Sequence, residues 1–224
     1  MDDTGTVRRE GAYWLTAPRP SWVPLLNDYL DPPQTSWSVL TGEHRPAAVL
    51  ALLSADDDPE LVLTLRSSDL DHHAGQISLP GGGREDGDDS PVDTALRETA
   101  EEIGLPVSMV APLGQLSSWQ IPVSRNQVIP VVGLWSGDHP LTALDTTEVE
   151  AVIRWRVSLL ADPAYRVMAR HPRGGHGAAW QIEDLFLWGF TGAVVDALLR
   201  VGGWEQDWDT NRLVEVPRRF SGQS

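Results

Sequence analysis

Short apolar runs separated by turn-forming residues dominate the middle of the chain and predict β-strands. Residues 45–54 ("RPAAVLALLS") and 60–67 ("ELVLTLRS") flank the turn "ADDDP", so we expect them to form a pair of strands. Residues 75–83 ("GQISLPGGG") predict a further strand that ends in a glycine loop. Two later runs, at residues 126–136 and 148–158, have the same strand character.

One segment, residues 90–104, has helical periodicity together with the signals that begin and end a helix. At about 100° per residue its apolar side chains share one stripe, which comprises Val92, Ala95, Leu96, Thr99 and Ile103. A serine precedes the stripe as an N-cap, a proline follows it at the first helical position, and a glycine with a nearby proline ends the segment. We therefore expect an amphipathic helix that packs on a sheet. A closing amphipathic helix is predicted at 184–203 and a short one at 21–30.

The combination of strands with two well-marked helices predicts an α/β or α+β sandwich. At 224 residues the chain is long enough for one large domain with extensions. We expect residues 1–45, rich in proline and tryptophan, to form an N-terminal extension that packs on the domain. The domain itself is expected at 46–205, with a C-terminal tail at 206–224.

Composition narrows the classes of function. The formal net charge is −15, from 32 acidic against 17 basic residues, which argues against binding to nucleic acid backbones. The chain has no cysteine, so a disulfide framework, a thiol nucleophile and a zinc–thiolate site are excluded. Neither a secretory signal nor an apolar run of membrane-spanning length is present. We expect a cytoplasmic protein without membrane or nucleic acid partners, either a monomer or a homodimer.

Three glutamates on the 90–104 segment raise a problem of charge repulsion. Glu98, Glu101 and Glu102 are spaced i, i+3 and i+4, so they are neighbours on one helix face. Two carboxylates about 4 Å apart in a partly buried site repel by roughly 4 kcal/mol at an effective dielectric of 20. A solvated face would interleave basic residues, yet only Arg97 is near. A hard divalent cation removes the conflict, because Mg²⁺ prefers oxygen ligands and is shared between carboxylates and substrate phosphates.

The spacing of these residues resembles the Nudix box, in which a glycine, five residues, an acid, seven residues and then Arg-Glu-x-x-Glu-Glu-x-Gly follow in order. The match runs from Gly83 through Asp89 to Arg97, the three glutamates and Gly104, with Leu105 as the closing apolar residue. In the family the acid is glutamate and mainly pairs with the box arginine. Asp89 is one methylene shorter, which puts an Asp89–Arg97 contact in question more than the chemistry.

The resemblance implies the Nudix fold, a mixed β-sheet sandwiched between helices, and hydrolysis of a nucleoside diphosphate derivative with Mg²⁺ or Mn²⁺. By position in the motif, Glu98, Glu101 and Glu102 would bind the metal, with the Gly83 carbonyl as a possible further ligand and Arg97 as part of the catalytic set. One of the glutamates, or an acid from a later loop, would deprotonate the attacking water. Glu148 and Glu150 in "DTTEVEAV" are the candidates for that later acid, and ordinary exposed strand residues are the alternative interpretation.

The segment "LVLTLRSSDLDHHAGQISLPGG" resembles the signature of the coenzyme A pyrophosphatase branch of the family. This resemblance implies that substrate is bound by Arg66, His73, Gln76 and Gly82; structural roles for Arg66 and His73 are the alternative. Two signature positions differ. Asp71 stands where a second arginine is expected, which could remove a phosphate contact, and Leu79 replaces phenylalanine, one apolar residue for another.

Three functions are therefore weighed. The first is hydrolysis of coenzyme A or a derivative to 4′-phosphopantetheine and adenosine 3′,5′-bisphosphate. The second keeps the metal site but takes ADP-ribose, a dinucleotide or a nucleoside triphosphate as the substrate. The third is a catalytically silent Nudix-fold domain that senses a nucleotide ligand. The intact set of three glutamates disfavours a silent sensor, because a sensor does not need to activate water. Metal-dependent turnover of any diphosphate substrate separates the two enzymes from the sensor.

Overall fold

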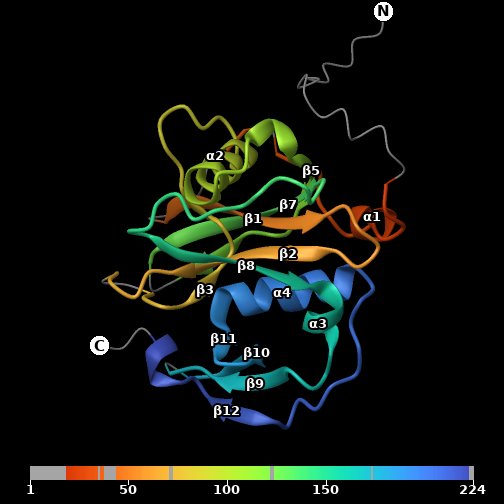
Figure 1. Cartoon of the computed structure of the whole chain (residues 1–224), viewed down its shortest axis with the longest axis vertical. Coiled ribbons are helices and arrows are strands. Elements are labelled where there is room, and N and C mark those ends of the chain that lie inside the picture. The colour runs from red at the N-terminus through yellow and green to blue at the C-terminus, as the bar shows by residue number, and fades with distance from the viewer. Residues whose placement is uncertain are drawn as a thin grey trace, which may run out of the picture.

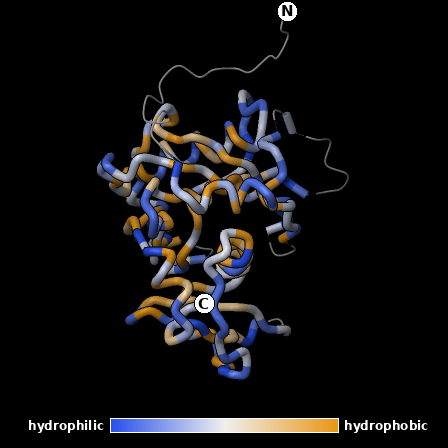
Figure 2. Tube along the Cα trace, turned by 90° about the vertical axis from the view of Figure 1, so that its right-hand side faces the viewer, coloured by the Kyte–Doolittle hydropathy of each residue, from blue (hydrophilic) through white to orange (hydrophobic). Residues whose placement is uncertain are grey.

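The computed structural model describes residues 19–34, 36–37, 44–70, 73–121, 124–172 and 174–221. Its elements form four layers, which are helix α2, a large mixed sheet, helices α3 and α4, and a second, smaller sheet (Figure 1). Hydrophobic segments run through both sheets, while hydrophilic ones lie in the peripheral loops (Figure 2). No helix in the described ranges is both long and apolar enough to span a membrane.

The large sheet has eight strands, with β3, β2, β1, β7 and β5 side by side and β4, β6 and β8 paired to β1, β7 and β2. Its strands are β1 (Arg45–Ser54), β2 (Glu60–Arg66), β3 (Ile77–Ser78), β4 (Gly81–Gly83), β5 (Ala111–Gln115), β6 (Trp119–Ile121), β7 (Asn126–Trp135) and β8 (Val149–Arg156). The predicted pair β1 and β2 is antiparallel, and β1 runs parallel to β7 over ten residues. The expected mixed sheet between helices is confirmed.

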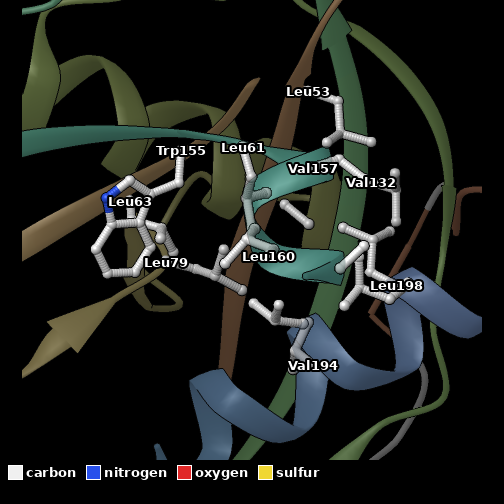
Figure 3. Packing of buried hydrophobic residues seen from close by; sticks show 14 of the residues in the cluster. Leu53, Leu61, Leu63, Leu79, Val132, Trp155, Val157, Leu160, Val194 and Leu198 are labelled. Atoms are coloured by element: carbon white, nitrogen blue, oxygen red, sulfur yellow. The ribbon is translucent and has the colours of Figure 1, made fainter. Parts of the chain in front are cut away.

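Both faces of the large sheet are covered, which explains why β1 reads as an almost continuous apolar run. Ala48, Leu50 and Leu52 face α2 (Pro91–Ile103), whereas Leu53 faces the opposite side. On that side the core joins the sheet to α3 (Val157–Ala161) and α4 (Gly189–Val201), as Figure 3 shows with ten labelled residues. The two cores hold α2 and α4 on opposite faces of one rigid sheet.

Helix α2 begins and ends as its sequence predicts. The Ser90 side chain accepts a hydrogen bond from the Asp93 amide, and Gly104 ends the helix in a left-handed conformation with φ of 75°. All five residues of the predicted apolar stripe are buried. The stripe interpretation is confirmed, and Glu98 and Glu101 lie outside this buried stripe.

The second sheet was not expected from the sequence. It is formed by β9 (Arg166–Arg170), β10 (His176–Ile182), β11 (Leu185–Leu187) and β12 (Leu213–Glu215), in the order β11-β10-β9-β12. The predicted helix at 184–203 is wrong at its start, because residues 185–187 pair with 180–182 across a tight turn at which Glu183 has a φ of 54°. The predicted helix at 21–30 is shorter, and α1 covers only Val23–Asn27.

The ends of the described chain pack on this framework. Trp22, Val23 and Leu26 belong to the core around α4, and the Trp22 ring lies 5.4 Å from that of Trp204. After α4 the chain returns along the second sheet as β12 and ends in a short 3-10 helix, Arg218–Phe220. Another 3-10 helix, Val107–Met109, follows α2. The expected boundaries at residues 45 and 205 stay predictions, and most of residues 1–45 lie outside the described ranges.

Candidate active site

The glycine loop lies against the middle of α2 because three glycines of β4 pair with Ala47, Ala48 and Val49 of β1. Gly81 has a φ of 146°, and a Cβ there would lie 2.4 Å from the carbonyl oxygen of Ala48. A Cβ on Gly82 would lie 2.4 Å from Oε1 of Glu98. The absence of side chains thus lets the Glu98 carboxylate rest directly on the backbone of the loop.

Arg97 joins several of the acidic groups. Its guanidinium donates to Oε2 of Glu101 at 2.9 Å, to Oε1 of Glu98 at 3.0 Å and to the Gly83 carbonyl at 2.9 Å. Nε and Nη2 of Arg97 also donate to the carboxylate of Asp88. These hydrogen bonds, together with the charge of Glu98, raise the pKa of Arg97 above its ordinary value, while burial acts in the opposite direction. Three of the four expected metal donors therefore converge on one guanidinium.

The acid that pairs with Arg97 is Asp88 rather than Asp89. Oδ2 of Asp88 lies 3.0 Å from Nη2 of Arg97 and also accepts hydrogen bonds from Thr94 Oγ1 and the Glu85 amide. Burial acts to raise the pKa of Asp88, but the hydrogen bonds from Arg97, Glu85 and Thr94 outweigh it and lower the pKa. Asp89 is exposed. The Asp89–Arg97 contact that the shorter side chain put in question is replaced by a contact of Asp88, because the turn from Glu85 to Asp88 directs this aspartate inward.

Two of the glutamate carboxyls, the buried Glu102 and the half-buried Glu98, have raised pKa values. Glu102 is 5% exposed and accepts a hydrogen bond from the Gly81 amide at 3.2 Å. Burial, with the charges of Glu98 and Glu148, raises the pKa of Glu102 to about 7, although the Gly81 amide and Arg66 act in the opposite direction. Burial also raises the pKa of Glu98, again with a contribution from Glu148. The site thus concentrates negative charge that a cation would stabilise.

Arg66 and Glu148 come to this site from outside α2. Arg66 ends β2 and its positive charge acts on Glu102, while its buried Nε has no hydrogen-bond partner among the described residues. Glu148 is exposed just before β8, and its carbonyl accepts a hydrogen bond from the Ser67 amide at 2.8 Å. Glu150, the other candidate acid, lines a pocket together with Leu65, Ala74 and Asp184. Of the two later acids, Glu148 is therefore the one that acts electrostatically on the carboxylates.

The other expected substrate residues contact each other and the C-terminal end of the chain. Nδ1 of His73 lies 3.0 Å from Oε1 of Gln76, and Nε2 of Gln76 donates to the carbonyl of Phe220 at 2.8 Å. No local pattern of residues indicates this long-range contact. Leu79 is buried in the core, in keeping with an apolar exchange at that position. Asp71 lies outside the described residues.

The donor set fits a hard divalent cation by its chemistry, since carboxylate and carbonyl oxygens are the ligands that Mg²⁺ and Mn²⁺ prefer. Among the described residues, however, no three acidic or histidine side chains are arranged to hold a metal ion, because Arg97 lies between Glu98, Glu101 and the Gly83 carbonyl. Burial is the main cause of the raised pKa values of Glu98 and Glu102, and the charges of neighbouring carboxylates add to it. Glu98, Glu101, Glu102 and Gly83 stay the predicted ligands.

Two relatives with similar sequences are named Nudix hydrolases. The chain is 37% identical over 166 residues to the uncharacterized Nudix hydrolase NudL of Escherichia coli K12, covering 72% of this chain and 85% of the relative. A protein of the same name from Cronobacter sakazakii is 37% identical over 174 residues, covering 76% and 88%.

Solved structures with the same type of domain have lower identity. The Nudix hydrolase RenU of Mycobacterium smegmatis is 18% identical with a TM-score of 0.48, over 78% of this chain and 95% of that one. A MutT/Nudix family protein of Enterococcus faecalis is 20% identical with a TM-score of 0.44, over 75% and 63%. The sequence model of the NUDIX domain family matches residues 43–170, which contain the whole glycine loop, α2 and Glu148. The chain therefore belongs to the Nudix hydrolase family.

Proposed function

We propose that this Nudix hydrolase cleaves the diphosphate of coenzyme A or a close derivative, giving 4′-phosphopantetheine and adenosine 3′,5′-bisphosphate. The observation that carries the proposal is the position of Arg66, a residue of the coenzyme A signature. Its buried Nε lacks a hydrogen-bond partner within the described ranges, and its charge acts on Glu102. A buried guanidinium donor without a partner is costly, and a phosphate oxygen of the substrate would satisfy it.

In this proposal each side chain of the site has a separate role. Arg66 binds a phosphate oxygen, and Arg97, held by Asp88, keeps Glu98 and Glu101 in position. Glu148, exposed at the rim of the carboxylate pair, accepts the proton of the attacking water. Glu98, Glu101, Glu102 and the Gly83 carbonyl would hold a divalent ion, Mg²⁺ or Mn²⁺, which would supply positive charge opposite the diphosphate.

The test is product analysis with coenzyme A, dephospho-coenzyme A and ADP-ribose, each with Mg²⁺ and with Mn²⁺. We expect coenzyme A to give the two products named above and to have the highest kcat/KM. Glu148→Gln should lower kcat by about 10²-fold or more, the usual effect of losing a general base. Glu183→Gln, in the exposed turn between β10 and β11, is the matched control and should leave kcat unchanged.

Three results would each contradict a different part of the proposal. Cleavage of ADP-ribose without cleavage of coenzyme A would overturn the substrate and leave the diphosphate chemistry standing. Wild-type turnover by Glu148→Gln would remove that residue as the base. Binding of a nucleotide without any turnover in either metal would favour the silent sensor.

A further inference from the structure

A pocket of about 390 Å³ lies beside the candidate active site, within the size range of small-molecule sites. It is formed where the end of β2 and the loop that follows it meet the turn between β10 and β11 and the last 3-10 helix. Its apolar lining comprises Leu65, Ala74, Leu185 and Phe220. No role was assigned to this pocket by the sequence, and two of its walls lie beyond the matched NUDIX domain.

Residues that line the pocket are close in sequence to Arg66 and Glu148, which the proposed function places at the diphosphate. Leu65 directly precedes Arg66 and Ser68 follows it by two positions, so residues on both sides of Arg66 line the pocket. Glu150, another lining residue, follows Glu148 by two positions. The loop that carries Ala74 is closed at its base by Arg66, whose amide donates to the Gln76 carbonyl at 2.9 Å and whose carbonyl accepts from the Gly75 amide at 3.2 Å. A substituent attached to a phosphate on Arg66 therefore has a short path into the pocket.

The last residues of the described chain form the far wall. Phe220 is 4% exposed and stacks with Phe186 at a centroid distance of 6.2 Å. Its carbonyl accepts hydrogen bonds from Nε2 of Gln76 at 2.8 Å and from Nε1 of Trp188 at 3.1 Å. These contacts place a wall from the C-terminal segment at a fixed position against the loop of the coenzyme A signature.

The charges of the lining select the kind of group that fits. Glu150 and Asp184 contribute two carboxylates, whereas Arg219 is the one cation among the residues that line this pocket. The Arg219 guanidinium already donates to the Asp184 carbonyl and lies 4.6 Å from the Phe220 ring centroid. The excess of acid disfavours a phosphate or carboxylate in the pocket, and the mixed lining suits an uncharged chain with amide groups.

We propose that this pocket binds the uncharged, amide-bearing arm attached to the diphosphate, which in coenzyme A is pantetheine, and that residues 219–220 form its far wall. The inference rests on the proposed function, because that function names the arm. It adds a specificity subsite built in part by the C-terminal segment. A substrate that lacks such an arm, such as ADP-ribose, gains nothing from the apolar side of the pocket.

The first test fills the pocket. Ala74→Phe should lower kcat/KM for coenzyme A by about tenfold or more, mainly through KM, while kcat/KM for ADP-ribose changes less than about twofold. Ala164→Phe, at an exposed turn outside the pocket, is the matched control and should alter neither substrate. An equal loss on both substrates, or no loss on either, overturns the inference.

A binding measurement separates the pocket from the reaction. Pantetheine alone, titrated by NMR into the metal-free protein, should perturb the wild type and the Ala164→Phe control but not Ala74→Phe. Should the wild type hydrolyse coenzyme A yet show no pantetheine binding, the pocket inference fails and the proposed function stands. Pantetheine binding without hydrolysis of coenzyme A has the opposite meaning: the proposed function fails and the pocket stands.

A third comparison tests the charge of the pocket without adding bulk. Asp184→Asn should raise kcat/KM for succinyl-coenzyme A relative to acetyl-coenzyme A by about twofold to fivefold, because it removes a repulsion with the terminal carboxylate. Glu183→Gln changes the neighbouring acid outside the pocket and should leave that ratio unchanged. An unchanged ratio in Asp184→Asn, or the same change in Glu183→Gln, contradicts the charge argument.

Discussion

Replacing Glu102 by glutamine should make the metal-free protein more stable at pH 8 while it removes most of the activity. Glu102 is almost fully buried, and its neighbours include the carboxylates of Glu98 and Glu148. Glutamine keeps the shape and can accept the hydrogen bond that the Gly81 amide donates to Oε2. It removes the charge, which is the part of this side chain that opposes folding when no cation is bound.

The magnitude follows from the pKa of Glu102, which is raised from the ordinary value of 4.5 to about 7. Between these two pH values the folded protein binds more protons at this carboxyl than the unfolded chain does, so stability falls as pH rises through this window. At about 1.4 kcal/mol per pH unit, the penalty reaches up to about 3 kcal/mol above pH 7 and is nearly absent below pH 4.5. Glu102→Gln should recover up to that amount at pH 8 and little at pH 4.5.

The assay is urea unfolding followed by tryptophan fluorescence, with EDTA present, at pH 4.5 and pH 8. Saturating Mg²⁺ should stabilise the wild type at pH 8 and have less effect on the variant, because the variant has lost a predicted ligand. Turnover of the variant should fall by orders of magnitude. The reasoning is refuted if the variant is no more stable than the wild type at pH 8 in EDTA, or if its advantage is the same at both pH values.

Three further results are expected. Asp88→Asn should lower kcat because Arg97 loses its buried partner, whereas Asp89→Asn should have little effect; equal kinetics of the two variants would contradict the assignment. Leu96→Ala should cost about 2–5 kcal/mol of unfolding free energy, and Asp93→Ala, which removes a partner of the Ser90 cap, about 1 kcal/mol; equal losses in urea unfolding would contradict the buried stripe. Asp71→Arg should raise kcat/KM for coenzyme A more than for dephospho-coenzyme A, and equal gains would remove position 71 from recognition of the 3′-phosphate.

Much of the candidate site was predictable because its signals are local. The stripe, N-cap and final glycine of α2 lie within fifteen residues and act through the geometry of one helix, so they were found correctly. The same holds for β1, β2, β7 and β8, whose apolar runs are long. The spacing of Glu98, Glu101 and Glu102 placed them as neighbours for the same reason.

Which aspartate side chain is buried beside Arg97 depends on the backbone conformation of the loop. Asp88 and Asp89 are adjacent and chemically identical, so only the folded turn, in which Asp88 meets the Glu85 amide, Thr94 and Arg97, decides which of them is buried.

Local patterns were enough to predict the helix of the motif, the central strands and the set of acids, because each depends on neighbours a few positions apart. The other features form through contacts between segments that are distant along the chain. The strands of the second sheet are short and gain their stability from pairing, which is why residues 185–187 form a strand rather than the start of α4. The hydrogen bond from Gln76 to the Phe220 carbonyl joins positions 144 residues apart and holds Phe220 at the pocket. No local pattern could indicate it, because the two segments meet only when both sheets have packed on α4.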